Sequence, residues 1–268
     1  MGTRQPDGPP PPPIVQRLRI RYAKRGRLRF VSHRDFARAF ERALRRSGVP
    51  TAFSAGFSPH PRISYVGAAP TGAASEAEYL EIGLQTECDP EEVRAALNAA
   101  LPDGLDILEV LPAGPGGLPD QIEAARWRIE LPGLSPEVLS SAVRDFLAQD
   151  SVIVERVTKK GLRLLDARSA VVSVSVERPG EARDRLDLGR EAGADGCAIL
   201  DLVVRQLSPA VRPDDVLTAL GAVAGLDGPL TSRSTRLAQG RLDTTGVLTD
   251  PLGPDRAAAA RDGAPGGT

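Results

Sequence analysis

The stretch that decides the fold is residues 30–79, which read FVSHRDFARAFERALRRSGVPTAFSAGFSPHPRISYVGAAPTGAASEAEY. The pattern predicts a helix, an irregular loop and two strands in succession. Both histidines of the chain, His33 and His60, lie in this stretch. Seven of the ten aromatic residues lie there too: Phe30, Phe36, Phe40, Phe53, Phe57, Tyr65 and Tyr79. Because these scarce residues gather here, we expect the binding surface of the protein in this stretch.

A helix is predicted to begin after Ser32 and to end at Ser47 and Gly48. Ser32 has the position of an N-cap, since Asp35 follows three residues later, and Gly48 is a C-terminal stop. The predicted buried face consists of Phe36, Phe40, Ala43 and Leu44. The other faces carry Arg34, Arg38, Arg42, Arg45 and Arg46. These arginines suit two roles, contact with phosphates or simple solvation with a favourable helix dipole, and the sequence leaves both open.

Residues 49–61 follow as an irregular loop, because Gly56, Pro59 and Pro61 interrupt any regular element. A loop that holds phenylalanine, serine and histidine beside a basic helix is a candidate ligand-facing loop. We expect Phe53 and Phe57 to anchor it back along the helix, so that His33 and His60 share one pocket.

Strands are predicted on both sides of this stretch. Residues 14–22 alternate, with Leu18, Ile20 and Tyr22 on one face and Arg17, Arg19 and Arg21 on the other. Further strands at 62–66, 77–84 and 105–111, and a helix from Pro90, complete the order of a ferredoxin-like unit. Helices cover one face of such a sheet, so we expect the arginine row on the open face.

The whole chain is predicted to be an α+β protein with two ferredoxin-like units in tandem, the second one elaborated. The expected segments are a disordered proline-rich arm (1–13), a first unit (14–112), a linker (113–121), a second unit (122–239) and a disordered tail (240–268). The second unit resembles the first in plan. It includes a hairpin that turns at Lys160 and Gly161, and the sequence does not show which of its strands are the additional ones. No run of about 18 apolar residues occurs, so we expect no membrane span and no membrane partner. Residues 1–13 lack the apolar core of a secretory signal, so we expect a cytoplasmic location.

The charge of the chain is unevenly distributed. The formal net charge is -1, yet residues 14–62 hold thirteen lysines and arginines against Asp35 and Glu41. A basic segment on an otherwise acidic protein favours a polyanionic partner, most simply RNA. The candidate RNA- or anion-binding residues are Arg17, Arg19, Arg21, Ser32, His33, Arg34, Arg38, Phe57, Ser58, His60 and Arg62.

No motif of a known reaction appears in the sequence. The phosphate-binding loop, the dinucleotide-binding glycine pattern, the zinc-protease motif, the hydrolase serine motif and the triple cysteine of radical SAM enzymes are all missing. Metal ligation by the two histidines is disfavoured, because Glu76, Glu78 and Cys88 stand at no diagnostic spacing, so we expect no metal and no cofactor. Acid–base catalysis on RNA by His33 and His60 needs no metal and stays open, as do ordinary structural roles.

Four motifs resemble the radical SAM-linked protein family, a domain of unknown function that also occurs fused behind cobalamin-binding radical SAM proteins. They are FVSHRD (30–35), ALRRSGVP (43–50), FSAGFSPHPRIS (53–64) and SEAEYLEI (75–82). Stand-alone members are often encoded near ribonuclease E/G and ribosomal proteins. The resemblance implies work on RNA, with a radical SAM protein or ribonuclease E/G as a partner in trans.

Three functions are compatible with these observations. The first is an RNA-binding accessory protein, related to tRNA or rRNA, that acts with a radical SAM or RNA-processing enzyme. The second is a metal-independent RNA-processing or RNA-modifying enzyme centred on His33 and His60. The third is a protein-interaction adaptor that binds no RNA.

Overall fold

The computed structural model describes residues 12–159, 161–177, 197–226, 228 and 230–262. It divides into two compact units, unit 1 with Met1–Gln121 and Asp250–Thr268, and unit 2 with Ile122–Thr249. The chain therefore leaves unit 1, builds unit 2 and returns to unit 1. Most of the expected N-terminal arm (1–11) and the last six residues (263–268) lie outside the described residues.

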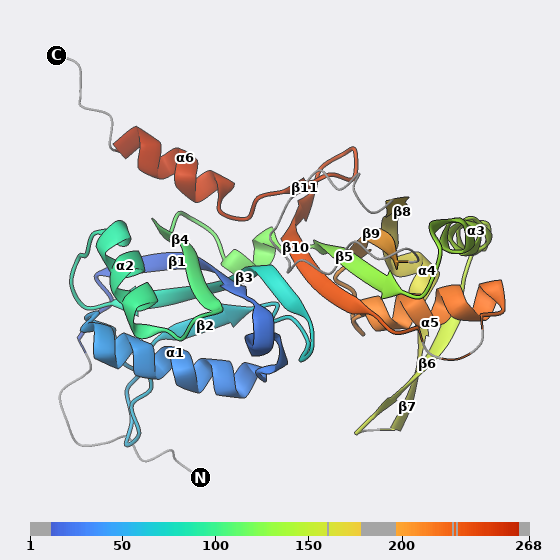
Figure 1. Cartoon of the computed structure of the whole chain (residues 1–268). Helices are drawn as coiled ribbons and strands as arrows, with labels where there is room; N and C mark the ends of the chain where they lie inside the picture. Colours follow the sequence, from blue (N-terminus) through green and yellow to red (C-terminus); the bar gives the residue numbers. More distant parts are fainter. Residues whose placement is uncertain (1–11, 160, 178–196, 227, 229, 263–268) are drawn as a thin grey trace, which may run out of the picture. The chain divides into compact units, whose positions relative to one another are not determined.

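Unit 1 has the predicted ferredoxin-like order (Figure 1). Its elements are β1 (Gln16–Lys24), the 3-10 turn η1 (Gly26–Phe30), α1 (His33–Ser47), β2 (Ile63–Val66), β3 (Ala74–Leu84), α2 (Pro90–Ala100) and β4 (Leu105–Pro112). The 3-10 turn η2 (Leu118–Gln121) ends this part of the unit. The strands lie in the order β4-β1-β3-β2, and each neighbouring pair is antiparallel. The α+β fold class predicted from the sequence is confirmed.

Helix α1 begins and ends where its sequence dictates. The backbone N–H of Asp35 donates to Ser32 Oγ at 3.2 Å, which satisfies one amide that the helix itself cannot. At the other end Gly48 adopts the left-handed conformation, with φ of 69°, that stops a helix. The buried residues are those predicted, Phe36, Phe40, Ala43 and Leu44.

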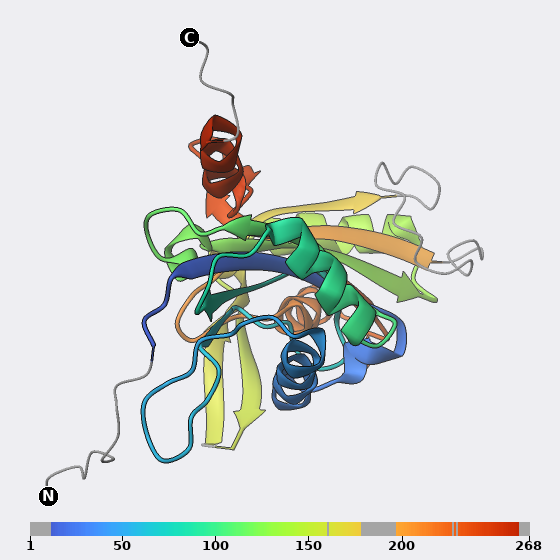
Figure 2. The ribbon, with the colours of Figure 1, turned by 90° about the vertical axis from the view of Figure 1, so that its left-hand side faces the viewer.

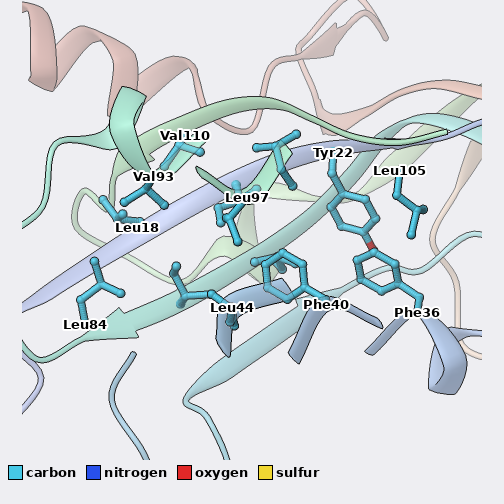
Figure 3. Packing of buried hydrophobic residues seen from close by; sticks show 14 residues of the cluster. Leu18, Tyr22, Phe36, Phe40, Leu44, Leu84, Val93, Leu97, Leu105 and Val110 are labelled. Atoms are coloured by element: carbon cyan, nitrogen blue, oxygen red, sulfur yellow. The ribbon is translucent and has the colours of Figure 1, made fainter. Parts of the chain in front are cut away.

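One hydrophobic core joins α1 and α2 to one face of the sheet (Figure 3). Leu18, Ile20 and Tyr22 reach it from β1 because alternate residues of a strand point the same way. The ring of Tyr22 stacks on that of Phe36 with 4.4 Å between centroids. The core thus fixes which side of β1 faces the helices, and it turns the intervening arginines to the second face of the sheet.

Arg19 does not lie on an open surface, contrary to the prediction. Only 2% of it is exposed. Its Nη1 donates to both carboxylate oxygens of Asp255, at 2.8 and 3.0 Å, and its Nε donates to Glu81 at 3.3 Å. Nη2 donates to the backbone carbonyls of Gly114 and Gly116. All its donor nitrogens therefore have partners inside the protein, and none is left for RNA.

Asp255 comes from a C-terminal helix that the sequence did not predict, α6 (Gly253–Asp262). The prediction of a disordered tail is wrong for residues 240–262. Asp255 is 1% exposed, and its Oδ1 also accepts the N–H of Gly114 at 2.7 Å. Beside it, Arg256 of α6 pairs with Glu109 of β4 at 2.8 Å. The segment around residues 113–116, expected to be a linker, is thus fastened to unit 1.

Unit 2 repeats the plan of unit 1 with an insertion. Its core elements are β5 (Ala124–Pro132), α3 (Pro136–Leu147), β8 (Val171–Glu177), β9 (Cys197–Arg205), α5 (Pro213–Ala224) and β10 (Arg233–Leu242), with β11 (Leu248–Thr249) on β10. The strand order β10-β5-β9-β8 matches that of unit 1. The insertion is the predicted hairpin, β6 (Ile153–Thr158) and β7 (Gly161–Asp166), followed by the short helix α4 (Ala167–Ala170).

We predict that Ser32→Ala lowers the free energy of unfolding by about 1 kcal/mol, because an N-terminal amide of α1 loses its partner. Ser32→Thr keeps the hydroxyl, which accepts from Asp35 N–H and donates to the Asp35 carboxylate, and serves as the control. Urea denaturation of both variants measures the difference. Unchanged stability in Ser32→Ala would show that the hydroxyl does not cap the helix.

We predict a large loss of stability when one partner of the Arg19–Asp255 pair is removed. Arg19→Met leaves Asp255 buried without its cation, which costs about 3–5 kcal/mol. The double variant Arg19→Met/Asp255→Leu is expected to regain much of this loss, since neither charge is then buried alone.

The matched control for this prediction is Arg17→Gln. Arg17 lies on the same strand and pairs with Glu81 at 3.0 Å, but its side chain is 56% exposed. An exposed pair contributes about 0–1 kcal/mol. Equal losses in Arg17→Gln and Arg19→Met, measured by urea denaturation, would contradict a buried pair.

Candidate nucleic-acid interface

The predicted binding residues fall into three separate places in unit 1. Arg17, Arg19 and Arg21 lie on β1 and point to the sheet face opposite α1. Arg34 and Arg38 lie on α1. The third group belongs to the loop that follows α1, with Phe57, Ser58 and His60 in the loop and Arg62 at its exit. The structure therefore does not bring the whole predicted set into one site.

The exposed face of α1 carries a continuous row of guanidinium groups. Arg34, Arg38, Arg42 and Arg45 are all exposed. At 100° per residue they fall within about 80° of arc, opposite the buried residues, and span roughly 16 Å along the axis. We call these four residues the arginine stripe. A row of cations with this length and direction can lie along several phosphates of one nucleic-acid strand.

The charges of the stripe are largely uncompensated. In the part of the chain that the structure describes, Arg34, Arg42 and Arg45 make no ion pair. Arg38 approaches Asp35 at 3.9 Å, an exposed contact of little energy. Arg25, by contrast, is paired with Glu76 and Asp106. The bond to Glu76 is the main cause that raises the pKa of Arg25. The stripe is thus a row of exposed positive charge that remains available to a ligand.

His33 lies away from the arginine stripe. It precedes Arg34 by 100° of helical rotation, which turns it toward the side of α1 that faces the sheet. Its ring meets that of Tyr65 on β2 edge to face, with 4.9 Å between centroids. Burial and the charge of Glu41 raise the pKa of Tyr65. His33 is exposed, but its contacts belong to the packing of α1 on β2.

His60 lies in a loop closed by its own hydrogen bonds. The N–H of Ser54 donates to the carbonyl of His60 at 2.8 Å, and the N–H of His60 donates to Ser54 Oγ at 3.0 Å. Phe53 and Pro61 form a bridge at the base. The loop extends away from α1 instead of folding back along it (Figures 1 and 2). Phe57, an expected anchor, is 77% exposed, so the anchoring prediction is wrong for this residue.

A shared pocket for the two histidines therefore stays a prediction without a supporting contact. His33 adjoins Tyr65, whereas His60 adjoins Ser54 at the far side of the Phe53–Pro61 bridge. The described residues contain no group of three or more histidine, cysteine or acidic side chains that could hold a metal ion. Nor does any helix of this part of the chain have the length and apolarity to cross a membrane.

Phe30 is a surface residue that sequence reasoning did not assign to the site. It ends η1, is 58% exposed, and carries the guanidinium of Arg29 over its ring at 4.7 Å from the centroid. Backbone hydrogen bonds hold η1 in place, from Gly72 N–H to the Arg29 carbonyl and from Arg25 N–H to the Gly104 carbonyl. The sequence signal that could have identified Phe30 is its position: it is an aromatic residue among arginines, two residues before the cap of a helix.

The fold and this surface define a protein of two ferredoxin-like units with one basic helix face. Residues 17–213 match a family model described as "Uncharacterized protein conserved in bacteria", DUF2344. The match covers more than half of the chain, and the chain belongs to this family. The family description names neither a radical SAM enzyme nor a reaction.

Two further comparisons add little. No curated protein matches the chain. Among solved structures, the first two RRM domains of yeast poly(U) binding protein (Pub1) are similar at 12% identity over 82% of this chain and 98% of that chain. The TM-score of that match is 0.18, so it supports no conclusion about this chain.

We predict that Tyr65→Phe leaves stability unchanged or raises it slightly. The Tyr65 hydroxyl is enclosed and finds no hydrogen-bond partner among the described residues. Removing a buried polar group that lacks a partner relieves its desolvation cost. Thermal unfolding measures the effect, and a loss of more than about 1 kcal/mol would show that this hydroxyl has a partner.

Proposed function

We propose that the protein is an RNA-binding accessory protein whose unit 1 holds the phosphate backbone of RNA along the arginine stripe of α1. The single observation that carries this proposal is the row of four exposed guanidinium groups, three of which make no ion pair among the described residues, on a helix whose opposite face is buried. Guanidinium groups form bidentate hydrogen bonds with phosphates, and they keep their charge at any physiological pH.

The face of unit 1 that binds RNA is the helical face in this proposal. The second sheet face is a poor platform because Arg19 is buried and paired, and Arg17 is paired with Glu81. Ser32, Arg62 and the loop residues Phe57, Ser58 and His60 border the two ends of α1. They remain candidate contacts, whereas Arg19 is withdrawn from the predicted set.

We further propose that the protein acts together with a partner enzyme. The motif resemblance supports a radical SAM protein or an RNA-processing enzyme acting in trans, on tRNA or rRNA. The alternative of catalysis by His33 and His60 has no contact in its favour, since the two imidazoles have different neighbours. A protein adaptor would use the same basic face for an acidic protein partner. A measurement of RNA binding distinguishes this adaptor from an RNA-binding protein.

The experiment is a titration of fluorescently labelled RNA with the full chain at several salt concentrations, followed by fluorescence anisotropy. We predict that Arg34→Gln/Arg42→Gln/Arg45→Gln weakens binding and flattens the dependence on salt. Three lost phosphate contacts lower the slope of log K against log salt by about 2. Circular dichroism should show an unchanged fold, because all three side chains are exposed.

The matched control replaces three exposed arginines of unit 2, Arg144, Arg163 and Arg205, by glutamine. It removes the same charge from the chain and should leave the slope almost unchanged. Equal effects of the two triple variants would mean that only the net charge matters. Absence of salt-dependent RNA binding in the parent chain would overturn the proposed function and favour the adaptor.

A further inference from the structure

We infer that the RNA bound by unit 1 is single-stranded, and that Phe30 and Phe57 are stacking platforms for unpaired bases at the two ends of the arginine stripe. This inference rests on the proposed function and adds the class of its ligand. The observation behind it is the exposure of two phenylalanine rings, 58% for Phe30 and 77% for Phe57, on segments that flank α1.

The two rings lie on the segments that precede and follow α1 in the chain. Phe30 ends η1, which is separated from α1 only by Val31 and Ser32. Phe57 lies in the loop that starts from the C-terminal end of α1 (Figure 1). Single apolar side chains on a surface are common and need no explanation. Two exposed aromatic rings, one before and one after a helix with a row of exposed arginines, form an arrangement that an extended strand can follow.

Both rings are held at the surface by backbone contacts. Gly72 N–H donates to the Arg29 carbonyl at 2.9 Å, and Val31 N–H donates to the Leu28 carbonyl at 3.0 Å, so the backbone on both sides of Phe30 is fixed. The loop that carries Phe57 is closed by the Ser54–His60 bonds. Neither ring has to leave a hydrophobic core before it stacks on a base. The entropy lost by ordering these segments on binding is therefore small.

The chemistry of the surface selects single strands over duplexes. Every base has a π face that stacks on an aromatic ring, and basic side chains then follow the backbone. In an A-form duplex the base faces are stacked on one another, and the accessible groups are phosphates, 2′-hydroxyls and base edges. A duplex could therefore use the arginine stripe but neither phenylalanine. At Phe30 the Arg29 guanidinium covers one ring face and adds a cation beside the base.

The test compares a single-stranded RNA with a hairpin duplex of the same number of phosphates, by fluorescence anisotropy at several salt concentrations. Phe30→Ala and Phe57→Ala should each weaken single-strand binding about 5- to 150-fold, the range measured for loss of one stacking contact. The salt slope should stay as in the parent chain, because no charge is removed. Duplex affinity should not change in either variant.

Two controls make the result specific. Phe30→Tyr and Phe57→Tyr retain the ring and should restore single-strand affinity, and Val247→Ala in unit 2 removes another exposed apolar side chain, 61% exposed, without effect. If the stripe variant loses binding while both phenylalanine variants keep it, the stacking inference is wrong and the proposed function stands. If the parent chain prefers the duplex, the inference is overturned as well. If neither RNA binds, the proposed function itself has failed.

Discussion

The buried ion pair between Arg19 and Asp255 is the contact on which the arrangement of unit 1 depends. It joins the first strand to a helix 236 positions later, and it ties in Glu81 and the backbone of Gly114 and Gly116. A charge taken out of water is tolerated only when its hydrogen bonds are met inside, and here every donor of Arg19 has an acceptor. The pair thereby fastens the C-terminal segment to the first unit, although the whole of unit 2 lies between them in sequence.

This contact decides which surface is available for binding. A ferredoxin-like sheet has one face covered by helices, and its second face is the usual place to look for a ligand. In unit 1 the centre of that second face is occupied by Arg19 and its partners, while α1 presents its arginines outward. The basic residues of 14–62 therefore lie in different places. Some lie on the sheet face that the helices do not cover, and others lie on the outer face of α1. Arg17 and Arg19 on β1 are paired with acidic residues of unit 1, and the arginine stripe on α1 remains for a partner.

Local signals in the sequence were sufficient for the elements themselves. The cap at Ser32, the stop at Gly48 and the alternation of Leu18, Ile20 and Tyr22 are set by neighbours within a few residues, so α1, β1 and the ferredoxin-like order follow from them. The burial of Arg19 could not be predicted, because alternation shows which face a side chain takes and not what covers that face. The helix around Asp255 was missed for a related reason: alanine, glycine and proline together suggest disorder, although alanine is the best helix former and Asp255 has a partner far away in sequence. Phe57 was expected to anchor its loop because a pocket shared by His33 and His60 requires the loop to fold back along α1.

The most direct test of this account is arginine modification by phenylglyoxal, followed residue by residue by mass spectrometry, with and without RNA. The account predicts that Arg19 reacts slowly in both conditions, and that Arg34, Arg42 and Arg45 react readily in the free protein and are protected by RNA. Ready modification of Arg19 at the rate of Arg17, or protection of Arg17 and Arg21 in place of the α1 arginines, would contradict the account and return the binding site to the sheet face.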